Sequence, residues 1–360
     1  MRILSIETSC DETAMAILDI SGSLSNPKIK IIKDIVASQI KLHAKFGGVV
    51  PNLAKREHLK NLPILLSKVV TSEKYIKSID VIAVTVGPGL EPALWTGIQF
   101  AKDLSKKWKK PIIGVNHLSG HLYSFLLSPK SKKRKIFPAI SLIVSGGHTI
   151  LAYMKNSGGY EKLGETLDDA VGESFDKVAR LLNLPYPGGP ALEKLAQKGN
   201  EKAIPFPSPM INQNNYDFSY SGLKTSVLYY LKNLGSTAKD FSLSLSDKKS
   251  LKKIESQKNL KADIAASFQR AAFAAPVKKT LAAAKKLKAR SILIGGGVAA
   301  NRMLPKMMRA EIKSKDLDIE VIVPPLKYCM DNAVMIALAS RLQPKNRKKY
   351  PLRADGNLSL

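Results

Sequence analysis

Cysteine and histidine are scarce in this chain of 360 residues, which has two cysteines and five histidines. Cys10 and Cys329 are too few for a disulfide framework, so we expect the chain in a reducing cytoplasm. No apolar run is long enough to cross a bilayer. The N-terminus, MRILSIETSCDET, carries acids within its first dozen residues, which argues against a signal or transit peptide. These absences exclude disulfide-rich secreted scaffolds and membrane-spanning proteins.

Acidic residues are also few relative to basic ones. Lys and Arg number 57 and Asp and Glu number 29, which gives a formal net charge of +28. The excess lies in runs at 106–110, 130–135, 248–253 and 345–349. It is typical of a protein that binds a phosphate-rich partner, above all nucleic acid, but a lysine-rich proteome explains it equally well. Aromatic residues do not interleave with the runs, apart from Trp108, so no stacking platform for single strands is predicted.

Two parts of the chain follow the same pattern of elements. Residues 2–18 and 139–153 each predict a strand, a small polar turn and a second strand. Residues 81–108 and 291–312 each predict an apolar strand, a glycine-rich turn and a helix. The repetition predicts a duplicated α/β protein with two lobes.

The predicted boundaries follow from composition. We expect an N-terminal lobe at 1–130 and a C-terminal lobe at 131–342, joined through the basic stretch 128–137. The polar, lysine-rich residues 235–260 predict a flexible insertion in the second lobe. The basic tail at 343–360 is predicted to be loosely ordered.

One histidine spacing is distinctive. In NHLSGH, His117 and His121 stand four residues apart, and on a helix such residues share a face. Two imidazoles on one face can bind a metal ion, although surface capping or a satisfied pair in the core explains the spacing at least as well. The Glu of H-E-x-x-H is missing, which argues against a zinc-peptidase helix. Asp331, before an apolar helix, is either the N-cap of that helix or the third ligand of a two-histidine, one-carboxylate set.

Two glycine-rich turns follow apolar strands in the second half. VSGGH, 144–148, and GGGVAAN, 295–301, can turn backbone amides toward an anion, the second at a helix N-terminus. Neither matches G-x-G-x-x-G or the Walker pattern, which argues against dinucleotide binding and an ordinary P-loop. One such turn alone is explained by chain reversal, but two in the same half favour a nucleotide cleft.

Three further segments leave alternatives open. The acids of 164–180, Asp176 among them, suit ribose hydroxyls or a metal, or the first turn of a helix. Gly188 and Gly189 permit close backbone approach to a ligand. HAKFGGVVPNLAKREH, 43–58, is either a substrate-facing loop or a structural turn.

Taken together, the motifs closely resemble the tRNA adenosine threonylcarbamoyltransferase family, once described as O-sialoglycoprotein endopeptidases. The resemblance runs from Ile3 to about Ala339. The opening ETSCDET resembles the bacterial and organellar branch. The matching stretches, in family order, are IETSCDET, HAKFGGVVPNLAKREH, GPGL, NHLSGH, VSGGHT, DDAVGESFDK, YPGGP, DFSYSGLKT, GGGVAANR and CMDNAVMIA.

The resemblance implies the bilobal actin-like ATPase fold, with two α/β halves around a nucleotide cleft. It implies one divalent metal ion, Fe²⁺ or Zn²⁺, with His117, His121 and Asp331 as ligands through which the metal would act in catalysis. It implies that threonylcarbamoyl-AMP binds as substrate. The implied contacts of this adenylate are Val144, Ser145, Gly146, Gly147, His148, Asp176, Gly189, Asn301 and, at the ribose, Glu193.

The implied reaction moves the threonylcarbamoyl group of threonylcarbamoyl-AMP to the exocyclic amine of the adenosine beside the anticodon, in tRNAs that read ANN codons. The products are N6-threonylcarbamoyladenosine in the tRNA and AMP. Glu12 and His148 are candidates for the base that takes the amine proton. The implied partners are tRNA, a shorter degenerate homologue of the same fold, a small P-loop ATPase and an upstream synthase that supplies the adenylate; no membrane is involved.

The chain departs from the family pattern at three places, one of which is the insertion at 235–260, longer than is usual in the family. Met330 stands where a Thr commonly precedes the aspartate, which concerns the geometry of Asp331. Glu91, Pro92 and Trp95 stand where smaller or apolar residues are common, which concerns the surface that pairs with the homologue. Three other functions stay as alternatives: a metalloprotease, a small-molecule kinase of the same fold, and a non-catalytic scaffold for tRNA and nucleotide.

Overall fold

The computed structural model describes residues 1–23, 26–132, 135–235, 259–342 and 350–360. Most of the predicted insertion, 236–258, and part of the predicted tail, 343–349, lie outside these residues. The chain forms two compact units, which depart from the predicted ranges because the chain returns to the first unit near its C-terminal end. Unit 1 comprises Met1–Ala139, Met154–Glu161 and Ile322–Leu360, and unit 2 comprises Ile140–Tyr153 and Lys162–Val321.

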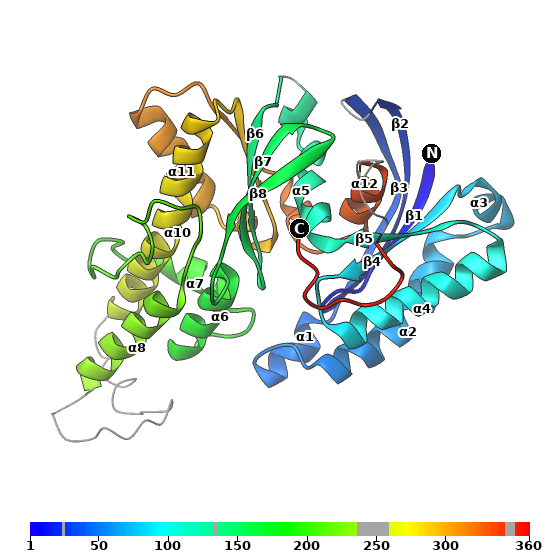
Figure 1. Cartoon of the computed structure of the whole chain (residues 1–360). Helices are drawn as coiled ribbons and strands as arrows, with labels where there is room; N and C mark the ends of the chain where they lie inside the picture. Colours follow the sequence, from blue (N-terminus) through cyan, green and yellow to red (C-terminus); the bar gives the residue numbers. More distant parts are fainter. Residues whose placement is uncertain (24–25, 133–134, 236–258, 343–349) are drawn as a thin grey trace. The chain divides into compact units, whose positions relative to one another are not determined.

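Unit 1 is built on a five-stranded sheet in the order β3-β2-β1-β4-β5 (Figure 1). Neighbours from β3 to β1 pair antiparallel, and neighbours from β1 to β5 pair parallel. The strands are β1 (Arg2–Glu7), β2 (Glu12–Ser23), β3 (Asn26–Ser38), β4 (Val81–Gly87) and β5 (Ile112–Asn116). Because β1, β4 and β5 are parallel, their carboxyl ends meet at one edge of the sheet, and this edge carries the site described below.

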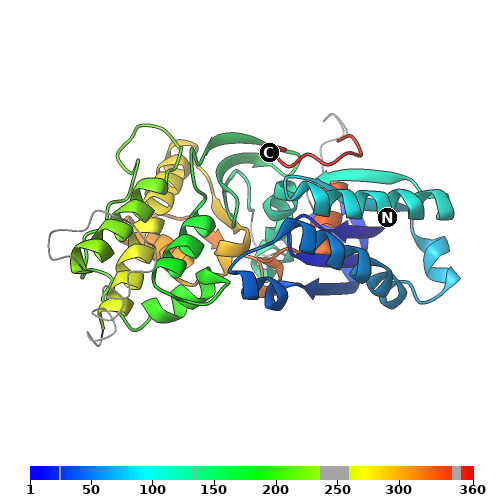
Figure 2. The ribbon, with the colours of Figure 1, turned by 90° about the horizontal axis from the view of Figure 1, so that it is seen from below.

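Helices cover the sheet of unit 1. The longer ones, α2 and α4, run side by side in both views of the ribbon (Figures 1 and 2). Both begin with proline in the first turn, where its missing N–H costs no hydrogen bond. The helices and 3₁₀ turns are α1 (Ile40–His43), η1 (Ala44–Phe46), α2 (Pro51–Val69), α3 (Glu73–Ser78), α4 (Glu91–Trp108), α5 (His117–Tyr123), η2 (Ser124–Leu127), η3 (Pro129–Lys132), η5 (Leu326–Tyr328) and α12 (Ala333–Leu342).

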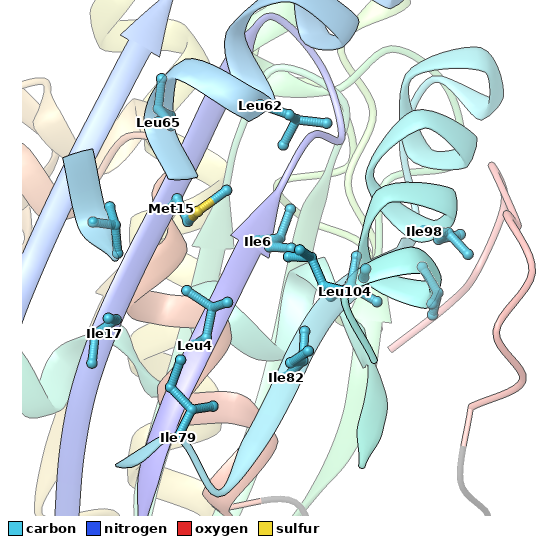
Figure 3. Packing of buried hydrophobic residues seen from close by; sticks show 14 of the residues in the cluster. Leu4, Ile6, Met15, Ile17, Leu62, Leu65, Ile79, Ile82, Ile98 and Leu104 are labelled. Atoms are coloured by element: carbon cyan, nitrogen blue, oxygen red, sulfur yellow. The ribbon is translucent and has the colours of Figure 1, made fainter. Parts of the chain in front are cut away.

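The main core of unit 1 lies between this sheet and helices α2 and α4. Leu4 and Ile6 of β1 belong to the same buried cluster as Leu62 of α2 and Ile98 of α4, and all four are labelled in Figure 3. Strand β1 is buried along nearly its whole length, including the polar Ser5 and Glu7 beside the apolar Ile3, Leu4 and Ile6. This packing fixes the strand whose last residue, Glu7, enters the site.

The last residues of the chain do not form the loosely ordered tail that we predicted. Leu352 and Leu358 pack against the core of unit 1, and Tyr350 bridges to Gly114 of β5. The N–H of Asp355 donates to the Val86 carbonyl of β4 at 2.9 Å. The prediction was wrong for 350–360 because the basic composition hides four hydrophobic residues that pack on the core, Tyr350, Leu352, Ala354 and Leu358, and a backbone that can bond to β4.

Unit 2 repeats the topology of unit 1. Its five-stranded sheet has the order β10-β9-β6-β7-β8. Strands β6, β7, β8, β9 and β10 correspond to β1, β2, β3, β4 and β5, so the two sheets have the same strand order. The duplicated α/β architecture predicted from the sequence is thereby confirmed. The elements are β6 (Ala139–Val144), β7 (Thr149–Asn156), β8 (Gly159–Glu165), α6 (Val171–Leu181), α7 (Gly188–Ala196), α8 (Ser221–Gly235), α10 (Leu260–Lys286), β9 (Ser291–Gly295), η4 (Gly297–Ala300), α11 (Met303–Ser314) and β10 (Glu320–Ile322).

Helix α10 runs through unit 2 beside α7, α8 and α11 (Figures 1 and 2). Its alanine-rich, largely buried surface lets these helices approach closely. Among the described residues, no helix has both the length and the apolar content needed to span a bilayer.

Candidate functional site

Helix α5 carries both histidines of the NHLSGH motif and begins at a fixed point. The side chain of Asn116, the last residue of β5, accepts hydrogen bonds from the N–H groups of Leu118 and Ser119 at 2.8 and 3.3 Å. This cap satisfies two of the backbone donors that a helix start leaves open. The helix therefore starts at the edge of the sheet, with His117 as its first residue.

The structure brings Asp331 to these two histidines. Its Oδ1 lies 3.5 Å from Nε2 of His117 and 3.2 Å from Nε2 of His121. The potential ligand atoms of the three residues all lie within 4.8 Å of one another. The two rings lie edge to face with centroids 4.7 Å apart. Residues 210 positions apart in the sequence thus form a cluster that can hold a metal ion.

Asp331 does not serve as the N-cap of α12, which was the alternative explanation for it. Asn332 is the N-cap, since its Oδ1 accepts the N–H of Met335 at 2.9 Å. The Nδ2 of Asn332 also donates to the Met330 carbonyl at 2.7 Å. The Met330 side chain is exposed, so the Met in place of the family Thr leaves this turn hydrogen-bonded.

The donor set fits a divalent metal. Nδ1 of His121 has no hydrogen-bond partner among the described residues, and its Nε2 faces only the Asp331 carboxylate, although the ring is 1% exposed. A buried imidazole without a partner is costly unless its nitrogen serves another purpose, and coordination is such a purpose. Two histidines and one carboxylate with open positions are a ligand set typical of catalytic Fe²⁺ and Zn²⁺ sites.

A second layer of residues surrounds His117. Its Nδ1 lies 3.2 Å from Oε2 of Glu7 and 3.2 Å from the Ser9 hydroxyl. Burial lowers the pKa of His117, but the charges of Asp331 and Glu7 outweigh it and raise this pKa to about 9. Burial raises the pKa of Glu7, but the charge and hydrogen bond of His117 bring the net result below its usual value. For His121, burial dominates and lowers the pKa.

Glu12, one of the two candidates for the base, has a strongly shifted pKa. Burial, followed by the charges of Asp331 and Asp11, raises the pKa of its carboxyl to about 10. A carboxyl with this pKa keeps its proton at neutral pH. It can act as a base only when the negative charge beside it is balanced.

Both histidines of the 43–58 segment have structural contacts in unit 1. His43 and His58 are both 0% exposed. His58 shares hydrogen bonds with the Thr13 hydroxyl at 2.8 Å and the Cys10 carbonyl at 2.9 Å, and His43 Nε2 with the Gln39 side chain at 3.0 Å. Burial lowers the pKa of His58, so it holds the Cys10 backbone as a neutral ring.

The predicted adenylate contacts lie in unit 2 and start at the turn after β6. Ser145 N–H donates to the His148 carbonyl at 2.8 Å, and His148 N–H donates to the Ser145 hydroxyl at 3.1 Å, which closes the VSGGH turn. Helix α6 begins against this turn, since Gly172 N–H donates to the Ser145 carbonyl at 3.2 Å. Val144, at the end of β6, is buried beneath.

The remaining predicted contacts are hydrogen-bonded to neighbouring helices of unit 2. Asp176 of α6 accepts the N–H groups of Gly188 and Gly189 at 2.8 and 3.2 Å. Glu193 of α7 accepts the N–H of Arg302 at 2.9 Å. Asn301 donates to the Gln269 side chain at 2.8 Å and accepts the N–H of Met303 at 2.9 Å, at the start of α11.

The glycines of this region divide into two groups. At Gly172, Gly188 and Gly296, a Cβ would come within 2.3 to 2.6 Å of neighbouring protein atoms, so packing alone requires glycine. At Gly146, Gly147 and Gly189, nothing lies within 4 Å of such a Cβ. The second group coincides with predicted adenylate contacts, and an open backbone without a packing reason is expected where a ligand approaches.

Sequence reasoning missed the layer behind the ligands, namely Glu7, Ser9 and Thr85. The signal that could have found Glu7 is an acid at the end of a buried strand, where a charge needs a partner.

Of the four basic runs predicted from the sequence, only 106–110 lies entirely within the described residues.

Comparison with known proteins agrees with the motifs. The family model described as "TsaD: tRNA N6-adenosine threonylcarbamoyltransferase" matches residues 30–338. A protein of Thermosipho melanesiensis named tRNA N6-adenosine threonylcarbamoyltransferase is 47% identical over 341 residues, 94% of each chain. A Bacillus subtilis protein of the same name is 43% identical over 363 residues, 100% of this chain and 96% of the relative.

Solved structures agree on the fold. HypF of T. kodakarensis matches with a TM-score of 0.59 at 14% identity, over 95% of this chain and 47% of that one. The activator of the 2-hydroxyisocaproyl-CoA dehydratase from Clostridium difficile, with bound ADPNP, matches with a TM-score of 0.50 at 14% identity, over 95% and 93%. The similarity shows the actin-like ATPase fold with duplicated halves.

Proposed function

Because the chain belongs to the tRNA N6-adenosine threonylcarbamoyltransferase family, we propose that it transfers a threonylcarbamoyl group from threonylcarbamoyl-AMP to a tRNA. The acceptor is the exocyclic amine of the adenosine beside the anticodon in tRNAs that read ANN codons. The observation that carries the metal-assisted form of this proposal is the cluster of His117, His121 and Asp331. The reaction takes place in the cytoplasm, where these tRNAs are used.

In the proposed step, the amine nitrogen attacks the carbamoyl carbon of the adenylate. The bond from that carbon to the phosphate oxygen breaks, AMP leaves with the electron pair, and the amine loses a proton. The donor is an activated mixed anhydride, so no nucleophilic Ser or Cys is needed. Burial and the charges of Asp11 and Asp331 raise the pKa of the Cys10 thiol, which agrees with Cys10 not acting as a nucleophile.

The described residues divide the work as follows. In unit 2, the turn from Val144 to His148 and the open Gly189 bind the adenylate through backbone groups, with Asp176, Glu193 and Asn301 around them. In unit 1, His117, His121 and Asp331 hold Fe²⁺ or Zn²⁺. When bound, this ion supplies Lewis-acid polarisation and charge for the leaving phosphate. Because an aromatic amine is a weak nucleophile, positioning contributes a large part of the acceleration.

We also propose the partners implied by the family resemblance: a shorter homologue of the same fold, a small P-loop ATPase and a synthase that supplies the adenylate. Support for a pairing surface comes from α2 and α4. Leu59 and Ile64 of α2 and Trp95 of α4 are large apolar side chains that are 56%, 50% and 44% exposed. Trp95 is one of the departures from the family pattern, so the matching surface of the homologue should differ accordingly.

A transfer assay tests the proposal. The purified protein is mixed with its proposed partners, unmodified tRNA and threonylcarbamoyl-AMP, and the digested nucleosides are measured by mass spectrometry. The wild type should form threonylcarbamoyladenosine, and the His117→Ala/His121→Ala variant should not. The Lys162→Ala/Glu165→Ala variant, which removes an exposed ion pair of β8, is the matched control and should keep full activity. No product from the wild type with intact adenylate would contradict the proposal and favour a kinase or a scaffold.

A further inference from the structure

Glu7 is a fully buried carboxylate without an obvious structural reason. It is 0% exposed. Three groups direct hydrogen bonds at it: the N–H of Ser9 at 2.6 Å, the Thr85 hydroxyl at 2.5 Å and Nδ1 of His117 at 3.2 Å. None of these is a lysine or arginine. Of the three donors only His117 can carry a positive charge, and burying a carboxylate is costly, so the pairing of Glu7 with His117 calls for a further reason.

The sheet explains how these groups meet. Glu7 ends β1 and Thr85 lies near the end of β4, which pairs parallel with β1. His117 follows β5, which pairs parallel with β4. Adjacent parallel strands therefore deliver an acceptor, a donor and an imidazole to the same edge. The arrangement depends on the sheet, whose rigidity suits a group that must hold another in place.

We propose that Glu7 is a positioning residue for the metal ligand His117: it accepts the Nδ1–H of His117 and so directs the Nε2 lone pair toward the metal. The proposal rests on the proposed metal site. It deepens that site by adding a residue that touches neither metal nor substrate. Outer carboxylates that accept the second N–H of a histidine ligand fix its tautomer and ring orientation and raise its basicity.

The geometry around His117 supports this direction. Nδ1 faces Glu7 and Ser9, whereas Nε2 faces Asp331 at 3.5 Å, so the two nitrogens have opposite tasks. Thr85 and Ser9 in turn occupy both oxygens of Glu7. The carboxylate therefore has little rotational freedom. Its negative charge, together with that of Asp331, also balances the two charges of a divalent cation within a region of low polarity.

His121 provides a contrast within the same site. Its Nε2 faces Asp331 at 3.2 Å, but its Nδ1 has no hydrogen-bond partner among the described residues, so no carboxylate holds the far side of its ring. Of the two histidines, His117 is thus the one whose tautomer the protein sets through a carboxylate. Loss of Glu7 should affect metal binding through His117 and leave the His121 environment unchanged.

The test compares Glu7→Gln, which keeps size and shape but removes the charge, with the wild type. Co²⁺ and Zn²⁺ are the probes, and their affinities are measured by competition with a chelator. We expect Glu7→Gln to bind both about tenfold to a hundredfold more weakly. In the Zn²⁺-loaded wild type, ¹⁵N NMR of histidine should show His117 protonated at Nδ1, and Glu7→Gln should show this signal shifted or exchange-broadened.

Two further variants separate positioning from folding. Thr85→Val removes one donor to Glu7 at nearly constant shape and should weaken metal binding less than Glu7→Gln does. Asp19→Asn changes a carboxylate of the same sheet that pairs with Arg2 instead, and should leave affinity unchanged. Urea unfolding in the presence of chelator reports the stability of each variant independently of the metal.

The outcomes are distinct. Weaker Co²⁺ and Zn²⁺ binding by Glu7→Gln with a changed His117 signal supports the proposal when urea unfolding in chelator shows that the variant is folded, and a loss of affinity explained by unfolding alone counts against it. Unchanged affinity and an unchanged His117 signal overturn it and leave the metal site standing. If the wild type and His121→Ala bind Co²⁺ equally weakly, the metal assignment fails, and the role of Glu7 fails with it.

Discussion

Asp168 holds the start of helix α8 from a distant part of unit 2. Its Oδ1 accepts the N–H groups of Tyr220 and Ser221 at 2.7 and 3.3 Å, and its Oδ2 accepts the hydroxyls of Ser219 and Ser221 at 2.5 and 2.6 Å. Backbone donors at a helix start have no partner inside the helix, so a carboxylate there caps it. Burial raises the pKa of Asp168, but these hydrogen bonds outweigh it and hold the pKa below its usual 3.8.

We expect Asp168→Asn to lower the free energy of unfolding by about 1 kcal/mol at pH 7, since the carboxylate is exposed and screened. A folded-state pKa below the unfolded one gives a contribution that is present above about pH 4 and is lost as the pH falls through the folded pKa. Urea midpoints of variant and wild type should therefore differ at pH 7 and converge below pH 3.8. Asp103→Asn, which changes an exposed carboxylate of α4, is the control. A difference between the two urea midpoints that stays constant with pH would contradict this account.

At the residue scale, the chemistry of the site was partly readable in the sequence. The spacing of His117 and His121 left a metal and a structural pair open, and the family resemblance added Asp331; the structure brings all three together. Glu7 could not be found in this way, because no sequence spacing relates the end of one strand to the start of a helix after another. Only the parallel pairing of the strands reveals that contact.

At the element scale, the site depends on how closely α12 approaches α5. The glycine inside the NHLSGH motif makes this possible: a Cβ at Gly120 would lie 2.9 Å from Cγ of Met335 and 3.2 Å from Cδ1 of Ile336. The hydroxyl of Ser5 in β1 donates to the Ala333 carbonyl at 2.6 Å and fixes the start of α12 against the sheet. Asp331 precedes that start by two residues, so the separation of the helices sets its distance from the histidines.

Gly120→Val should therefore displace α12 and weaken metal binding. Overpacking of this kind typically costs about 1–3 kcal/mol of stability. Adding Met335→Ala to the variant opens space and should restore part of both stability and Zn²⁺ affinity, as a coupled pair in contact does. Gly222→Ala in α8, whose nearest neighbour is 3.6 Å from the added Cβ, is the control and should be neutral or stabilising. Full affinity in Gly120→Val would show that the helix spacing does not set the site.

The elements themselves were predicted well where apolar periodicity is strong, as in the strand, turn and helix at 81–108. The tail was not, because its few apolar residues carry no period. Leu352 and Leu358 find their place only once the sheet exists, and Asn116 donates to the Ser359 carbonyl at 2.8 Å. Packing onto a preformed surface of this kind cannot be recognised from local composition.

At the scale of the whole molecule, the two halves share one topology although they are far from identical in sequence. The repeated order of strands was predictable because the pattern of turns recurs in the sequence. The return of α12 to unit 1 was not, since its contacts with α5, β1 and β2 join residues far apart in the chain. Asp331 reaches His117 and His121 through this return, so the cluster in unit 1 needs both ends of the chain.

The net charge of +28 allows a last prediction about tRNA. If about five phosphates are contacted, the affinity should fall on the order of a hundredfold between about 50 and 200 mM salt, because counterions are released on binding. The run at 106–110 should contribute little to this. Helix α4 starts beside the carboxyl edge of the sheet and extends about 27 Å away from it at 1.5 Å per residue, so its basic end lies far from the metal ligands.

Replacing Lys106, Lys107, Lys109 and Lys110 with Gln tests this directly. We expect the slope of log affinity against log salt to change by less than the roughly 0.7 to 0.9 that one lost phosphate contact causes. Binding of unmodified tRNA measured by filter retention over a salt series gives the slope, and the circular dichroism spectrum confirms the fold of the variant. A decrease of the slope by the amount expected for three or four contacts would place tRNA on the end of α4. The lysines there would then form a binding surface and would not be a mere consequence of lysine-rich composition.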